Sequence, residues 1–156
     1  MISIIVPTYN EEKNIVRFQE NLKTLKGDFE VLFSDGFSSD DTYDLIKYNK
    51  IRETRFRSKQ MNAAAKYAKG DILWFVHADS ILHPDSVIAI ENANAEAGCF
   101  RLNFDDTNFF QNILQFCSNY RVLSRNIAFG DQGIIIRREL FDEIGGYKPY
   151  PIMEDY

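Results

Sequence analysis

The sequence lacks three glycine-containing motifs, each of which marks a large class of enzymes. No GxGxxG follows the first apolar segment, which argues against a nicotinamide-dependent dehydrogenase. No GxxxxGK[ST] occurs, which argues against a P-loop phosphotransferase. No GxSxG occurs either, so the nucleophile turn of an α/β-hydrolase is missing.

Long apolar runs and cysteines are also scarce. No apolar run approaches the roughly 20 residues that span a bilayer. The N-terminal residues MISIIVPTYN have no basic region and no small-residue cleavage site, so we expect no signal peptide. The two cysteines, Cys99 and Cys117, have no metal-ligand or CxxC spacing. We therefore expect reduced, partly buried thiols in a cytoplasmic protein.

The chain lacks an overall positive charge, but its charge is unevenly spread. The net charge of −5 argues against nucleic acid or an anionic membrane as the main partner. Residues 47–69 hold eight basic residues and one acid, so this segment carries +7 and the remainder −12. Two interpretations stay open: a solvated helix face, or a site for a small anion such as a diphosphate.

Apolar periodicity predicts strands that alternate with helices. The predicted strands are 2–6, 29–33, 52–56, 72–76, 98–104 and 132–137, and the predicted helices are 11–26, 42–48, 58–68, 83–96, 107–124 and 138–146. This alternation indicates βαβ units, a mostly parallel sheet and helices on both faces. With 156 residues, 45% of them apolar, we expect one globular domain over 1–156.

Polar residues follow the predicted strands, where ligands bind in parallel sheets. Asp79 could hold a hard divalent cation or cap a turn. Asp35 could accept a hydrogen bond from a ribose hydroxyl or a base N–H, or close an Asx-type turn. His77 could contact a ribose or phosphate, or be a hydrogen-bonded structural histidine. Asp40 and Asp41 are typical of the N-cap and first turn of the next helix.

Two further segments are open to two interpretations. Glu154 and Asp155 could be surface charge, but the YPIM segment before them, flanked by proline, favours a fixed placement. The helix at 107–124 has a broad apolar stripe, for which we expect packing against the sheet. The other interpretation is an apolar acceptor channel or a contact with a membrane surface.

Six segments in order give the chain a resemblance to the family 2 glycosyltransferases, which are inverting enzymes of the GT-A fold. They are IIVPTYNEE (4–12), DGFSSDDT (35–42), RSKQMNAAA (57–65), ILWFVHADS (72–80), GDQGIIIRRELFDEIGGY (130–147) and IMED (152–155). The resemblance implies a Rossmann-like three-layer α/β/α sandwich with a mostly parallel central sheet. HAD and GDQ together resemble a compact branch without membrane helices.

The resemblance also implies roles for particular residues. Asp35 would read the base, Arg57 would lie near the nucleotide sugar, and Asp155 would be the catalytic base. Asp79, the last acid of the family's metal motif, would bind Mn²⁺ or Mg²⁺, and His77 stands where that motif usually has its first acid. The other residues implied at the nucleotide and substrate site are Pro7, Thr8, Tyr9, Glu11, Ala78, Gly130, Asp131, Gln132 and Glu154. Phe37 is a departure, because glycine is common at its position.

The implied reaction moves a sugar from a UDP-, GDP- or dTDP-sugar to an acceptor hydroxyl, with a saccharide or lipid-linked acceptor. From the charge, the cysteines and the apolar helix, we also expect a cytoplasmic protein that does not bind nucleic acid and that could contact the inner face of the membrane or form a homo-oligomer. The alternative is a nucleotide-sugar-binding module without transfer, because family members usually continue beyond the IMED segment. A nucleotidyltransferase is a weaker alternative, because PTYNEE has no glycine, lysine or arginine.

Overall fold

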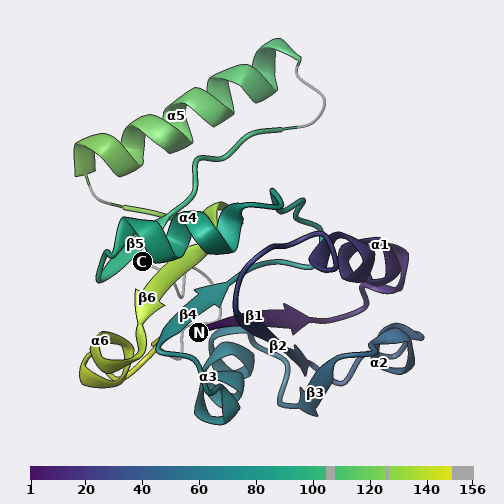
Figure 1. Ribbon diagram of the computed structural model, residues 1–156. Coiled ribbons are helices and arrows are strands. Elements are labelled where there is room, and N and C mark those ends of the chain that lie inside the picture. The colour runs from purple at the N-terminus through teal and green to yellow at the C-terminus, as the bar shows by residue number, and fades with distance from the viewer. Residues whose placement is uncertain (105–107, 126, 149–156) are drawn as a thin grey trace.

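The structure is a computed structural model that describes residues 1–104, 108–125 and 127–148. These residues form a six-stranded sheet with the order β3-β2-β1-β4-β6-β5 (Figure 1). The strands are β1 (Ile2–Thr8), β2 (Phe29–Asp35), β3 (Asn49–Arg52), β4 (Ile72–Phe75), β5 (Ala97–Cys99) and β6 (Ile134–Arg137). The strands β3, β2, β1 and β4 are parallel, and β6 is antiparallel to both of its neighbours.

Helices cover both faces of this sheet, so the predicted three-layer arrangement is confirmed. The helices are α1 (Glu12–Leu22), α2 (Thr42–Leu45), α3 (Arg57–Tyr67), α4 (Ser86–Ala93), α5 (Phe109–Arg125) and α6 (Arg138–Glu143), and η1 (Gly130–Gln132) is a 3-10 turn. One face packs against α1 and α4, and the other against α3 and α6.

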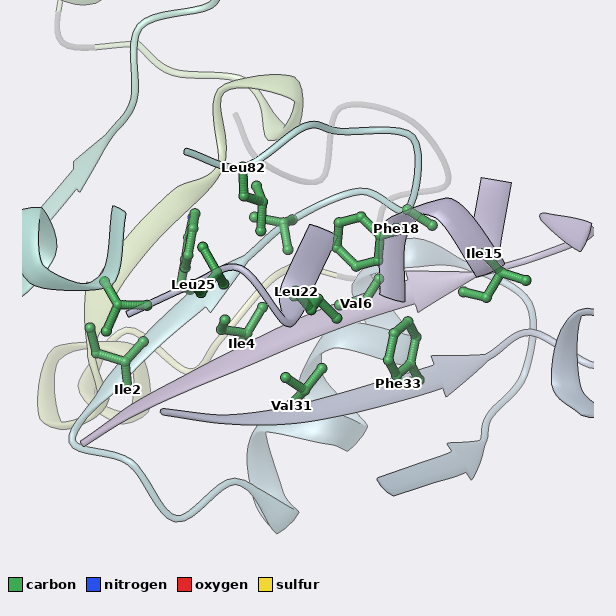
Figure 2. Close-up of a cluster of buried hydrophobic side chains, with 14 of the residues drawn as sticks. Ile2, Ile4, Val6, Ile15, Phe18, Leu22, Leu25, Val31, Phe33 and Leu82 are labelled. Carbon is green, nitrogen blue, oxygen red and sulfur yellow. The ribbon is translucent and has the colours of Figure 1, made fainter. Parts of the chain in front are cut away.

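Successive side chains of a strand point to opposite faces of the sheet, so the sheet has one hydrophobic core on each face. In β1, Ile4 and Val6 pack on the side of α1, whereas Ile5 packs on the side of α3. Figure 2 shows Phe18 and Leu22 of α1 lying over the strand residues of the first core. Each fully buried side chain of this kind stabilises the fold by about 1.5–3 kcal/mol. A strand buried on both faces explains why ISIIV is almost wholly apolar.

Several predicted boundaries are wrong. The third strand lies at 49–52 rather than 52–56, because it pairs with Leu32–Asp35 and the chain then enters α3. The strand predicted at 98–104 covers only 97–99, because β6 offers it a short partner that begins at 134. The second helix stops at Leu45, because Ile46 is extended. The fourth helix stops at Ala93, because Asn94 is left-handed with φ 45°.

The position of α5 also differs from the prediction. No residue of this helix is buried, and Figure 1 shows it at the rim of the molecule, apart from the sheet. Its expected packing against the sheet is therefore wrong. Within the described residues, no helix is long and apolar enough to cross a membrane. Both cysteines are free thiols: Cys99 is half-buried, which raises its thiol pKa, and Cys117 is exposed.

Candidate functional site

The carboxyl ends of the parallel strands bring the predicted site residues to one edge of the sheet. Thr8 at the end of β1 pairs with Asp35 at the end of β2, and Asp35 pairs with Arg52 at the end of β3. The antiparallel β6 starts opposite the end of β4, so the GDQ turn reaches the same edge. Parallel α/β sheets bind ligands at this edge.

Asp35 is fully buried at this edge. Its carboxylate accepts hydrogen bonds from the N–H of Ser38 (2.9 Å) and from the Ser38 hydroxyl. The Nε atom of Arg52 lies 3.8 Å from Oδ2 of Asp35. These contacts confirm the local turn, and they use only part of the acceptor capacity of the carboxylate. Its contact with a base stays a prediction.

The loop after β1 is hydrogen-bonded to the loop after β2. The side chain of Asn10 accepts from the N–H of Ser39 (2.9 Å), and the N–H of Asn10 donates to the Ser38 hydroxyl (3.0 Å). The N–H of Glu11 donates to the hydroxyl of the buried Thr42 (2.7 Å). Asn10 and Phe37 both have left-handed backbones, with φ of 55° and 60°. The two loops therefore form one rim, in which Thr8 lies beside Asp35 and Glu11 lies beside Thr42.

Asp40 joins the start of α1 to the start of α2. Burial raises the pKa of its carboxyl, but hydrogen bonds from the Thr42 hydroxyl, the Thr42 N–H and the Glu12 N–H outweigh that effect. The pKa of Asp40 is therefore below its ordinary value. The predicted capping role belongs to Asp40, because Asp41 is the N-cap of α2 but makes no side-chain capping bond.

Two arginines at this edge were not singled out from the sequence. The guanidinium of Arg52 lies 3.9 Å from the ring centroid of Tyr43, and that of Arg55 lies 4.1 Å from the ring centroid of Tyr9. Arg57, which the resemblance named, is exposed at the start of α3. The sequence signal that could have identified them is the +7 segment, whose arginines lie at the end of β3 and just after it. At least part of that segment is thus gathered at the edge rather than spread over a solvated helix face.

Asp79 lies on an exposed turn after β4, beside the half-buried His77 and the buried Ala78. It lines a pocket of about 190 Å³ together with Asn14, Arg17, Phe18, Asn21, Ala78, Ser80 and Ile81. No group of three or more metal-ligating side chains occurs in the part of the chain that the structure describes. A single exposed carboxylate still fits Mg²⁺ or Mn²⁺, which take one or two protein carboxylates and complete their shell with phosphates and water.

The GDQ turn packs against the end of β4. Gln132 is buried, and its Oε1 accepts from the N–H of Phe129 (3.3 Å). Its Nε2 is buried and has no hydrogen-bond partner among the described residues. Gly133 has φ 66°, and a Cβ there would lie 2.9 Å from the indole nitrogen of Trp74. Glycine is therefore required for the close approach, while Asp131 is exposed.

Glu154 and Asp155 lie outside the described residues. The same is true of the whole IMED segment. Their roles stay predictions.

A sequence model described as Glycosyl transferase family 2 matches residues 3–145 of the chain. The chain belongs to this glycosyltransferase family. This confirms the resemblance seen in the sequence, and it identifies the sheet edge described above as part of a family 2 domain.

Individual relatives agree with this assignment. The family 2 domain is 28% identical to an uncharacterized glycosyltransferase of Haemophilus influenzae, over all of this chain and 60% of that protein. It is 33% identical to the poly(ribitol-phosphate) β-N-acetylglucosaminyltransferase TarS of Staphylococcus aureus, over 54% of this chain and 17% of that protein. The chain thus spans less than two thirds of the length of these relatives.

Solved structures show the same fold. The crystal structure of S. aureus TarS residues 1–349 matches with a TM-score of 0.77 and 24% identity, over 99% of this chain and 52% of that chain. The mannosyltransferase PcManGT of Pyrobaculum calidifontis, in complex with GDP-Man and Mn²⁺, matches with a TM-score of 0.73 and 24% identity. This match covers 94% of this chain and 47% of that chain. These matches confirm the GT-A fold of the family 2 domain.

Proposed function

We propose that this family 2 domain binds a nucleoside diphosphate sugar at the carboxyl edge of its sheet and transfers the sugar to an acceptor hydroxyl with inversion. The observation that carries the proposal is the buried carboxylate of Asp35, with Arg52 beside it on the Tyr43 ring, and with Arg55 held on the ring of Tyr9 in the neighbouring loop. TarS structures with UDP and with UDP-GlcNAc, and the PcManGT complex with GDP-Man and Mn²⁺, support a donor of this class.

In this proposal the nucleoside lies between the loops after β1 and β2. Asp35 accepts a hydrogen bond from a base N–H, and Pro7, Thr8, Tyr9 and Glu11 line the nucleoside. The hydroxyl oxygen of Thr8 is buried and has no hydrogen-bond partner among the described residues, so it is available to a ligand. Arginine side chains favour phosphate oxygens, because their fork of N–H donors matches them.

A divalent cation, Mn²⁺ or Mg²⁺, would be held by Asp79 together with the donor diphosphate. When bound, it supplies Lewis-acid stabilisation of the negative charge on the leaving group. His77 and Ala78 place Asp79 at the end of β4. Asp131 and Gln132 lie on the turn beside β4, where the free amide of Gln132 would donate to the sugar or acceptor.

The reaction itself is a single displacement at the anomeric carbon. The acceptor oxygen forms a bond to that carbon while the bond to the diphosphate oxygen breaks, and the diphosphate keeps the electron pair. Asp155, beside Glu154, takes the proton of the acceptor hydroxyl as general base. Arg57 and Lys59, exposed near the N-terminus of α3, stabilise the charge that develops on the diphosphate.

Replacing the proposed base separates binding from chemistry. We expect Asp155→Asn to leave UDP or GDP affinity unchanged but to lower sugar release from UDP-GlcNAc or GDP-mannose by about 100-fold or more, as loss of a general base predicts. Release is measured with water as acceptor, by the nucleotide formed. The control is Asp142→Asn, an exposed carboxylate on α6.

Full turnover in Asp155→Asn would contradict the assignment of the base. Nucleotide binding by the unaltered protein without any sugar release would instead favour the alternative, a nucleotide-sugar-binding module.

A further inference from the structure

Phe37 has an unusual backbone for its side chain. It follows Asp35 and Gly36 in the loop after β2, and its φ is 60°. A left-handed backbone brings Cβ close to the following carbonyl oxygen, so it is unfavourable for a bulky residue. The two other non-glycine residues with such a backbone in the described part of the chain are Asn10 and Asn94, and asparagine tolerates it. Glycine or asparagine would therefore fit position 37 better than phenylalanine does.

The neighbouring glycine does not relieve this strain. Gly36 is not left-handed. A Cβ at Gly36 would lie 3.2 Å from Nε2 of Gln60 and 3.4 Å from Cα of Arg55. Glycine thus suits position 36 because the chain passes close to these two residues. The left-handed residue of the turn is Phe37 instead.

Packing does not explain why position 37 holds phenylalanine. The side chain is 59% exposed, and it belongs to neither hydrophobic core. The guanidinium of Arg52 lies 5.9 Å from the ring centroid of Phe37 but only 3.9 Å from that of Tyr43. Tyr43 therefore supplies the nearer ring for Arg52. An exposed aromatic ring on an unfavourable backbone is typical of a functional site.

The ring lies on the rim where we place the nucleoside. Nε of Arg52 is 3.8 Å from Oδ2 of Asp35, so the same arginine approaches both the buried carboxylate and the ring of Phe37. The next residue, Ser38, donates its N–H to Asp35 (2.9 Å), and its hydroxyl accepts from the N–H of Asn10 (3.0 Å). These bonds fix the loop that carries the ring against the loop after β1.

A flat exposed ring near a carboxylate matches the chemistry of a nucleobase. Every base has a π-face that stacks on aromatic side chains. The edge of a base also carries N–H groups, which a carboxylate accepts. Stacking depends little on which base is present, because all bases have such a face.

We propose that Phe37 stacks on the nucleobase of the sugar donor while Asp35 binds the edge of the base. This inference rests on the proposed function, because it takes the rim as the nucleoside site. The left-handed backbone lowers the stability of the free protein, whereas stacking stabilises the complex. Removal of the side chain therefore changes stability and affinity in opposite directions, which loss of a purely structural residue does not do.

The variant Phe37→Gly tests this inference. UDP, GDP and dTDP are titrated with Mn²⁺, and the nucleotide that binds the unaltered protein is used for the variants. We expect Phe37→Gly to weaken its affinity by about tenfold, through loss of stacking. The melting temperature should rise by about 2 °C, because relief of the left-handed strain outweighs the greater freedom of glycine in the unfolded chain. Phe37→Tyr, which keeps the ring, should keep the affinity.

The matched control is Asn94→Gly, which removes another left-handed side chain, with φ 45°, at the end of α4. Oδ1 of Asn94 accepts from Nη2 of Arg137 (2.7 Å), and Arg137 pairs with Ile72 at the start of β4. Asn94 therefore lies at the opposite edge of the sheet from the proposed site. Its replacement should leave the nucleotide affinity unchanged.

Equal affinity of Phe37→Gly and the unaltered protein would overturn the stacking and leave the proposed donor site intact. Weaker binding by Phe37→Gly together with a lower melting temperature would also overturn it, since Phe37 would then support the loop. Binding of no nucleotide by the unaltered protein would overturn both the stacking and the proposed function.

Discussion

At the residue scale, Asp35 has the most constrained environment of the site. A buried carboxylate is unfavourable unless hydrogen bonds and an opposite charge compensate its loss of water. Here the N–H and hydroxyl of Ser38 supply the hydrogen bonds, and the half-exposed Arg52 supplies the charge. An aspartate that only closed an exposed turn would need neither these hydrogen bonds nor the nearby arginine. The burial of Asp35 therefore favours a function that uses its negative charge, such as binding a ligand.

Asp35→Asn should weaken UDP or GDP binding by about tenfold or more, because a hydrogen bond to a charged acceptor contributes about 1.5–3 kcal/mol. Its amide presents a donor where Ser38 already donates, so we also expect a loss of about 1–3 kcal/mol in the free energy of unfolding. Calorimetric titration and urea unfolding measure the two effects. The control is Asp41→Asn, an exposed carboxylate in the next turn. Unchanged nucleotide affinity in a folded Asp35→Asn would show that the carboxylate does not bind the base.

At the scale of elements, α3 holds the ends of β1 and β2 together through one side chain. Nε2 of the buried Gln60 donates to the carbonyl of Thr8 (2.8 Å) and to that of Ser34 (2.7 Å). Both carbonyls lie next to the proposed nucleoside. Gln60 is therefore a positioning residue, since it acts on the ligand through the two strands.

Gln60→Leu should lower the free energy of unfolding by about 1–3 kcal/mol, because it removes two buried hydrogen bonds, each of which contributes about 0.5–1.5 kcal/mol. It should also weaken nucleotide binding, since Thr8 and Asp35 lose their fixed spacing. Urea unfolding and titration with UDP or GDP measure both effects. Lys66→Leu, at an exposed position on the same helix, is the control and should change neither. If Gln60→Leu lost stability but kept full affinity, the residue would support the fold alone.

The predicted order of strands and helices was correct. The exact ends of these elements could not be predicted, because they depend on which neighbouring strand or helix each element pairs with in the fold. The nearly continuous apolar run ISIIV and the periodicity of α1 are local signals, and they were sufficient to predict these two elements. The arm after Cys99 has a strand-like sequence as well. Its N–H groups at Leu102 and Phe104 nevertheless bond to Asn119 and Gln115 of α5, because β6 is too short to pair with them.

For the whole molecule, the sequence predicted which strand ends lie at one edge of the sheet better than it predicted the side-chain contacts there. The rule that ligands bind at the carboxyl ends of parallel strands placed Thr8, Asp35 and Asp79 at one edge. The ring contact of Arg55 with Tyr9, 46 positions apart, leaves no local signal in the sequence. The outward orientation of α5 could not be predicted either, because an apolar stripe shows which side is covered but not by what.

The most direct test of the donor site is a calorimetric titration of UDP, GDP and dTDP, each with and without Mn²⁺. It is run on the unaltered protein, on Asp79→Ala and on the control Asp142→Ala, which removes an exposed carboxylate of α6. The account predicts Mn²⁺-dependent binding of one nucleotide, kept in Asp142→Ala and lost in Asp79→Ala. Binding of none of the three nucleotides, or equal Mn²⁺-dependent binding by Asp79→Ala, would contradict it.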